Sequence, residues 1–577
     1  MLITRFRTLL TTPRATGTSL ATSLWALASL GVCAFYAYLA TRRGFAEPYV
    51  VEDDVRQHVF WMQRFLDPGL FPGDLIADYY QSVEPAGFIV LYRTMAAIGI
   101  EPILLSKLLP MVLGLAATAY CFALSMKLLP VPFAAFTASL LLNQVIWQRL
   151  DISSATPRAF LYPFFLGFLV YFTRRSTIGC LVMIALCGLF YPPMLFIVSG
   201  VLVLSLLRWE RGRPRLTSEG SSYRLSLTGL AVVLVVLLAF ALKSSQFGST
   251  VTFDEARMLP HELAGRRLSL LSADLAESLL WDGQGGLLAR MYPLPVALAA
   301  GILLPLLMRY NGRFPLARWI DPAIRVLPMI ALVSALMFLA AHAVLFRLYL
   351  PNRYTQHSFF ILMPLAAGPA ITILLDAFLQ WTETLKKVRG LVVAVGAVVL
   401  LGALLFSYPL VVQRFPRTKW IIGQQIALYE FLLKQPKDTL IASLSVEANN
   451  LPTFSKRPVL VAQEYANPFH ATYYLELNRR YLDLLDAQYT ADPKNVQDFV
   501  GKYGVDLFVL DRKAFTPKYP IRQRVVKLFK PIAKEIKGRL KQGQQPVLLK
   551  RLKDCTVLET DKLIVLDAKC VSAADQN

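Results

Sequence analysis

Glu52-Asp53-Asp54-Val55-Arg56-Gln57-His58 follows the first apolar segment of the chain. Ten further apolar segments come after it, so this polar run lies in the first loop of a polytopic membrane protein. Two adjacent carboxylates are costly beside an anionic membrane surface. The run therefore indicates chemistry at that surface rather than packing.

The composition of the 577 residues supports an integral membrane protein. Hydrophobic residues make up 55%, charged residues only 17%, and the mean hydropathy is +0.48, whereas soluble domains carry about 25% charged residues. A span needs roughly 20 apolar residues. The predicted spans are 22–41, 103–126, 130–147, 158–173, 177–191, 192–208, 225–242, 291–308, 326–346, 358–377 and 391–411.

The distribution of Lys and Arg predicts the orientation. The first apolar segment has a basic flank and no small-residue cleavage site, which is typical of a retained signal anchor. With a cytoplasmic N-terminus, the cytoplasmic segments hold 18 Lys and Arg against 4 acids, and the outer loops up to residue 357 hold 14 against 16. This asymmetry follows the positive-inside rule. We therefore expect a plasma (bacterial inner) membrane protein, with the short segment 85–100 as an interfacial or partly inserted helix.

The chain divides into two predicted domains. Residues 1–412 form a transmembrane domain with long outer loops at 42–102 and 243–290, and residues 413–577 form an extracytoplasmic α/β domain. Strands are predicted at 439–444, 458–462 and 505–510, and helices at 422–434, 473–488 and 495–503. Cys555 and Cys570 flank a predicted hairpin, where a disulfide and free thiols are both open alternatives.

The net charge is +22. It is mostly explained by the Lys and Arg that set the orientation of the chain in the membrane, so no nucleic-acid partner is predicted. The basic amphipathic segment 522–553 has two interpretations. It lies on anionic lipid headgroups, or it is an ordinary solvated helix face.

The polar groups of three outer loops form the candidate site. Asp53 and Asp54 are candidate catalytic carboxylates, and Arg56 suits a phosphate through its bidentate fork. Alternatively, the two acids only stabilise the N-terminus of a helix predicted at 55–65. Asp151 and Arg158 converge on the same side of the membrane, with a cap and a headgroup contact as their alternatives. The run Arg353-Tyr354-Thr355-Gln356-His357 adds groups that could bind a donor phosphate.

These motifs resemble the GT-C class of membrane glycosyltransferases, and its aminoarabinose transferase and protein O-mannosyltransferase members in particular. Asp53-Asp54-Val55-Arg56 is similar to the Asp-Glu-x-Arg run of the aminoarabinose transferase branch, and Glu84-Pro85-Ala86-Gly87-Phe88 to its Pro-x-x-Gly-aromatic segment. The resemblance implies that Asp53 is the catalytic carboxylate, Arg56 a donor-phosphate contact and Asp151 a second outer carboxylate.

Glu84 departs from that branch, which has a lysine immediately before the proline. A carboxylate cannot bind phosphate directly, so Glu84 is a candidate ligand for a divalent cation such as Mg²⁺ or Mn²⁺. No cofactor is otherwise required by the sequence.

The function predicted from the resemblance is transfer of a sugar from a polyprenyl-phosphate-linked donor to a glycan, lipid or protein acceptor at the outer face of the membrane. Membrane lipids are the other expected partners. The chain lacks the HExxH, CxxC, GxSxG and P-loop motifs. Two alternatives stay open. One is a transporter or lipid flippase, and the other is a non-catalytic scaffold whose outer domain binds partners.

Overall fold

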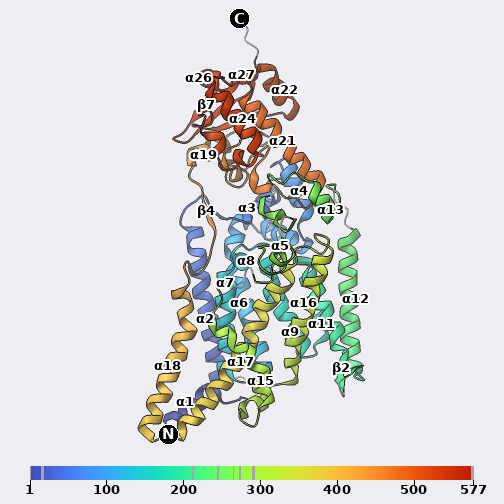
Figure 1. The fold of residues 1–577 in the computed structure, drawn as a ribbon, viewed down its shortest axis with the longest axis vertical. Helices are drawn as coiled ribbons and strands as arrows, with labels where there is room; N and C mark the ends of the chain where they lie inside the picture. The colour runs from blue at the N-terminus through green and yellow to red at the C-terminus, as the bar shows by residue number, and fades with distance from the viewer. Residues whose placement is uncertain are drawn as a thin grey trace.

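The computed structural model describes residues 2–14, 19–210, 213–242, 246–263, 265–271, 274–288 and 293–573. Figure 1 shows an elongated molecule, with long helices running side by side and a domain containing a small sheet at one end. The N-terminal helix α1 (Leu2–Thr11) lies at the opposite end.

The described residues contain six helical segments that are long and apolar enough to cross a membrane. They are α2 (Leu20–Thr41) with the short helix η1 (Arg42–Phe45), α6 (Pro102–Leu128), α12 (Gly220–Leu242), η7 (Pro322–Arg325) with α16 (Val326–Ala343), α17 (Asn352–Glu383) and α18 (Lys387–Val411). The prediction of a multi-pass helical membrane protein is confirmed.

The other predicted spans form shorter helices. They are α7 (Pro132–Gln148), α9 (Leu161–Thr173), α10 (Thr177–Phe190), α11 (Met194–Ser205), and η5 (Val296–Leu303) continued by α15 (Leu304–Arg309). Residues 291–292 of the predicted span 291–308 lie outside the described residues. The 14 residues of α10 extend about 21 Å, less than the roughly 30 Å of a hydrocarbon core. Pro192 and Pro193 separate α10 from α11, because proline cannot donate to a helical ladder.

Helices α17 and α7 form the centre of the bundle. Every residue of α7 is buried, and α17 is the most buried of the long apolar helices. The two helices approach closely at Gly368, where a Cβ atom would lie 2.5 Å from the Ala134 carbonyl oxygen. A small residue at this crossing lets the two backbones pack together.

The segment 85–100 contains α5 (Ala86–Ala97). Its 12 residues extend about 18 Å, too short to cross a membrane. Phe88, Tyr92 and Ala96 are buried, and the helix packs against α6 and α10.

The C-terminal region contains a four-stranded sheet in the order β5 (Ile441–Ala442), β6 (Leu507–Asp511), β8 (Leu563–Asp567), β7 (Thr556–Glu559). β5 and β6 are parallel, and the other neighbours are antiparallel. Helices α19 (Ile426–Leu433), α21 (Ala471–Tyr489) and α22 (Pro493–Tyr503) correspond to the predicted helices. The strand predicted at 458–462 is wrong: Val459 forms one isolated bridge to Ile441, because β5 offers only two residues for pairing. Cys555 and Cys570 form a disulfide.

The predicted amphipathic segment 522–553 is not one helix. It contains η10 (Val526–Leu528), α24 (Lys530–Lys541), α25 (Val547–Lys550) and α26 (Leu552–Cys555). Pro531 occupies the first turn of α24, and Gly543 has a φ of +86°, which ends it. Ala533 and Ile536 of α24 are buried.

A two-stranded sheet joins the first loop to the segment after the last long helix. β1 (Val50–Glu52) pairs antiparallel with β4 (Trp420–Ile422), with Glu52 opposite Trp420. This pairing places the residues that follow β1 beside the start of the C-terminal region.

Candidate active site

The first loop is folded rather than irregular. After β1 come α3 (Val55–His58), η2 (Phe60–Phe65) and α4 (Leu75–Val83), so the helix predicted at 55–65 is interrupted at Val59. Asp54 precedes α3, but its side chain forms no cap hydrogen bond. Asp54 is therefore not a side-chain cap of α3.

Asp53 is buried between two cations from different parts of the chain. One carboxylate oxygen contacts Arg56 and the other contacts Lys419, while the Asp53 backbone N–H donates to the Lys419 carbonyl at 3.0 Å. Arg56 also donates to Asn450 Oδ1 at 2.8 Å and lies 3.3 Å from Glu464 Oε2. The C-terminal region thus supplies three partners to the predicted catalytic pair.

Asp54 points to a second group of charges. It contacts Arg158, whose Nη1 lies 3.4 Å from Asp151 Oδ1. Burial would raise the pKa of Asp54, but the attraction of Arg158, His58 and Lys419 outweighs it, so this pKa lies below the usual value. Asp54 of the first outer loop and Asp151 of another outer loop therefore share the guanidinium of Arg158.

Asp151 continues this network into α9 and α17. Its Oδ2 accepts from the Tyr162 hydroxyl at 3.1 Å and lies 3.6 Å from Nδ1 of the fully buried His357. His357 Nε2 is 3.4 Å from the Tyr191 hydroxyl. The fold therefore connects Asp54, Arg158, Asp151 and His357 in one continuous set of polar contacts.

Glu84 forms an ion pair with His58 Nδ1 and is buried. Burial would lower the pKa of His58, but the charge and hydrogen bond of Glu84 raise it above its usual value. Glu84 thus favours a positive charge on the His58 imidazole.

Two buried arginines retain unused donors. Nε and Nη1 of Arg353 have no hydrogen-bond partner among the described residues, and neither do Nε and Nη2 of Arg149. Both residues are buried, with exposed fractions of 7% for Arg353 and 9% for Arg149, so water is largely excluded from these donors. Arg149 lies over the Phe360 ring at 5.0 Å. Residues 353, 357 and 360 share one face of α17, so Arg353 and the Arg149–Phe360 contact lie on the same helix face as His357. Buried guanidinium groups without partners are expected to bind an anion.

Tyr354 lies apart from these contacts. Its hydroxyl donates to the Leu348 carbonyl at 2.6 Å, and its ring packs against Phe196.

Several site residues were not predicted from the sequence. Arg149 lies in the loop that supplies Asp151, so its position was a usable signal. Lys419, Asn450 and Glu464 carry no such signal, because only the β1–β4 pairing and the docking of the C-terminal region bring them to Asp53.

The carboxylates do not fit a divalent cation as arranged. No group of three His, Cys, Asp or Glu side chains among the described residues could hold a metal ion. Asp53, Asp54 and Glu84 each contact a cation of the protein instead.

No family model and no curated protein matches this sequence. Solved structures do match it. The archaeal oligosaccharyltransferase AglB from Archaeoglobus fulgidus, in complex with an inhibitory peptide and a dolichol-phosphate, has a TM-score of 0.51 at 12% identity, over 89% of this chain and 72% of that chain. The A. fulgidus oligosaccharyltransferase with Zn and sulfate has a TM-score of 0.50 at 13% identity, over 88% and 70%.

ArnT from Cupriavidus metallidurans, bound to undecaprenyl phosphate, covers 96% of this chain and 99% of its own at 13% identity, with a TM-score of 0.43. The oligosaccharyltransferase matches show that the chain has the fold of GT-C membrane glycosyltransferases. The predicted fold class is confirmed.

Proposed function

We propose that the protein is a membrane glycosyltransferase that takes a sugar from a polyprenyl-phosphate-linked donor and transfers it to a glycan, lipid or protein acceptor. The observation that carries the proposal is a pair of buried guanidinium groups with unused donors. They belong to Arg149, two residues before Asp151, and to Arg353, one helical turn before His357. A donor phosphate would supply the anion that these groups lack. Planar guanidinium forks bind phosphate bidentately.

In this proposal Asp53 is the catalytic base. An acceptor hydroxyl attacks the anomeric carbon, its proton passes to Asp53, and the carbon–oxygen bond to the donor phosphate breaks with its electron pair on the phosphate. Positive groups at that phosphate stabilise the departing charge. Arg56, Arg158, Arg149 and Arg353 are the proposed sources of this charge.

Asp53 needs a free carboxylate oxygen to accept a proton. Of its two cationic partners, Lys419 is the one that can move away and leave its oxygen free. The Lys419 side chain is 58% exposed, whereas the Arg56 side chain is 6% exposed. We expect the donor phosphate to attract Lys419 away from Asp53. Binding of the donor would then free the base.

The proposed location is the outer face of the plasma membrane, with the N-terminus in the cytoplasm. The excess of Lys and Arg in the loops at the other end of the helices supports this orientation.

The proposal is tested by measuring the lipid-linked sugar in cells that lack the protein. We expect a polyprenyl-phosphate sugar to accumulate, to disappear when the wild-type chain is restored, and to persist with D53N or R353Q. D67N is the matched control, because Asp67 lies in the same loop and pairs with Lys437 on the surface. Lipid extraction and mass spectrometry give the amount, and immunoblotting of membranes checks expression.

Clearance of the lipid by a normally expressed D53N variant would overturn the role of Asp53. Absence of any accumulating lipid-linked sugar would overturn the proposed reaction itself.

A further inference from the structure

A polar pocket lies at the end of the helices opposite the C-terminal domain. Its volume is about 380 Å³, within the usual range of ligand sites. The pocket is formed by the end of α6, the turn between α9 and α10, β2 (Leu207–Glu210), the segment after β3 (Arg213–Leu216), the start of α12, η7 and the start of α16. None of its lining residues belongs to the candidate active site.

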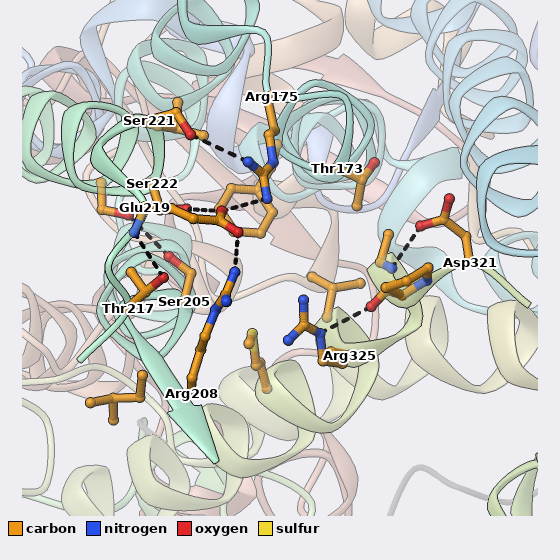
Figure 2. A pocket seen from close by; sticks show the side chains of 18 of the residues that line it. Thr173, Arg175, Ser205, Arg208, Thr217, Glu219, Ser221, Ser222, Asp321 and Arg325 are labelled. Carbon is orange, nitrogen blue, oxygen red and sulfur yellow. Dashed lines mark hydrogen bonds and ion pairs between the residues drawn. The ribbon is translucent and has the colours of Figure 1, made fainter. Parts of the chain in front are cut away.

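The pocket has a surplus of positive charge. Four cations line it, Lys127, Arg175, Arg208 and Arg325, against the two acids Glu219 and Asp321. Figure 2 shows Arg175 and Arg208 converging on Glu219 from opposite sides, with Arg325 reaching into the same space.

The two acids are already paired. Glu219 contacts Arg208 and lies 2.7 Å from Arg175, and Lys127 lies 2.6 Å from Asp321. Arg325 donates through Nε to the Pro322 carbonyl at 3.2 Å, and it forms no ion pair with any described residue. The guanidinium of Arg325 is therefore available to an anion. Glu219 holds the guanidinium groups of Arg175 and Arg208 in the same pocket.

The remaining lining suits a molecule with a polar head and an apolar body. Thr217, Ser221 and Ser222 lie on one side of the pocket (Figure 2), and its lining also includes the apolar side chains of Phe172, Leu207, Leu225, Val326 and Met329. Basic pockets between helices at the surface of a membrane bind the headgroups of anionic lipids.

We propose that this pocket binds the phosphate headgroup of an anionic membrane lipid. Arg325 and the unused donors of Arg175 and Arg208 bind the phosphate oxygens, the hydroxyl groups hydrogen-bond to the glycerol, and the acyl chains follow the apolar wall. Such a lipid would bridge η7 to α12, a helix that is mostly exposed within the protein itself. A zwitterionic lipid binds less well, because its own cation opposes Arg325.

Native mass spectrometry of the full chain, titrated with phosphatidylglycerol or phosphatidylcholine, tests the proposal. We expect the wild-type protein to prefer phosphatidylglycerol, and R325Q to weaken its binding about fivefold, as expected for removal of one cation near a membrane phosphate. R325K should retain most of the affinity. R318Q is the matched control, because Arg318 lies in η6 (Pro315–Trp319) at the same end, is exposed, and does not line the pocket.

Equal affinity of R325Q and the wild-type protein would overturn the site, and so would an equal loss in R318Q. Displacement of phosphatidylglycerol by an equal concentration of soluble glycerol 3-phosphate would overturn the assignment to a lipid and indicate a soluble phosphate instead.

Discussion

Glu84 sets the charge of His58, and the pH dependence of stability should report this pairing. Because the pKa of His58 is raised in the folded protein, the pair stabilises the fold fully below the unfolded pKa of about 6.5. This contribution is lost as the pH rises through the raised value. We expect E84Q to lower the Tm more at about pH 6 than at about pH 9. Thermal unfolding in detergent measures the difference.

The control for E84Q is E262Q, which removes an exposed acid from another loop. Its effect on the Tm should not change with pH. A Tm difference between E84Q and the wild-type protein that stays constant with pH would contradict the pairing.

The individual acids and bases were predictable where they lie in the same loop as a recognisable motif. Asp53, Asp54 and Arg56 were predicted in this way, and the Asp54–Arg158–Asp151 contacts bring two outer loops together. Lys419 was not predictable, because its contact with Asp53 depends on a strand register between residues more than 360 positions apart.

The β4 strand positions Lys419, and a glycine in η1 gives that strand its space. The Trp420 ring packs where a Cβ atom on Gly44 would lie 2.5 Å away, and Trp420 Nε1 donates to the Ala40 carbonyl at 2.8 Å. Overpacking of this kind costs about 1–3 kcal/mol. We expect G44A to displace β4, to lower the Tm, and to slow clearance of the lipid-linked sugar.

The matched variant is G31A, because a Cβ atom on Gly31 meets nothing within 4 Å. It should leave both the Tm and the clearance rate close to the wild-type values. Equal effects of G44A and G31A would refute the role of the β1–β4 sheet in holding Lys419.

Across the whole chain, hydropathy predicted the helical membrane layout because backbone groups in lipid must bond within helices. It did not predict how long each helix is. A helix surrounded by other helices, such as α7, is buried on every side and yet need not span the bilayer alone. The docking of the C-terminal region on the first loop was also missed, because no local pattern encodes a contact between Arg56 and Asn450.

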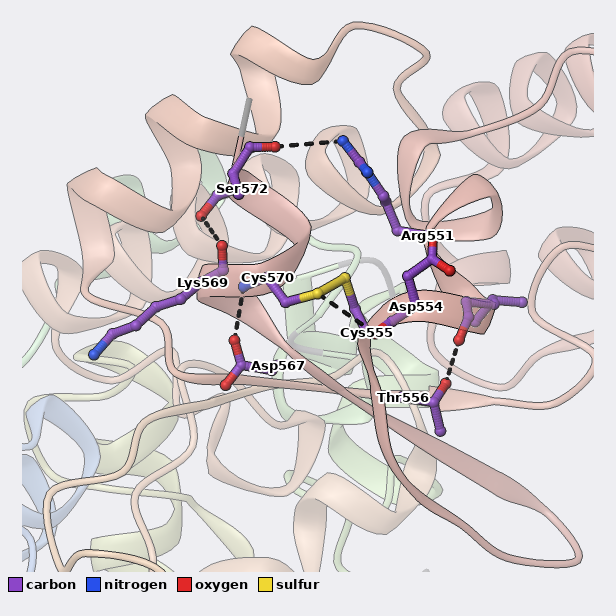
Figure 3. Close-up of a disulfide and its surroundings, with 10 residues drawn as sticks. Arg551, Asp554, Cys555, Thr556, Asp567, Lys569, Cys570 and Ser572 are labelled. Atoms are coloured by element: carbon purple, nitrogen blue, oxygen red, sulfur yellow. Dashed lines mark hydrogen bonds between the residues drawn. A yellow bond between two sulfur atoms is a disulfide. The ribbon is translucent and has the colours of Figure 1, made fainter. Parts of the chain in front are cut away.

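The orientation of the whole molecule is testable with single cysteines at its two ends. Four native cysteines are free and buried, and Cys555 and Cys570 are joined in a disulfide (Figure 3), so the wild-type protein should give little thiol labelling. Glu47 is exposed near the β1–β4 sheet, and Asn311 is exposed after α15 at the opposite end. The positive-inside rule places residue 47 outside.

We therefore expect an impermeant maleimide to label E47C in intact cells and N311C only after permeabilisation. The two variants control for each other, since both cysteines are exposed and differ only in the end of the molecule that carries them. Labelling of N311C alone in intact cells would reverse the orientation, and the carboxylates would then face the cytoplasm. In that case the basic pocket would face outward, and a donor entering from the outer leaflet could not reach Asp53.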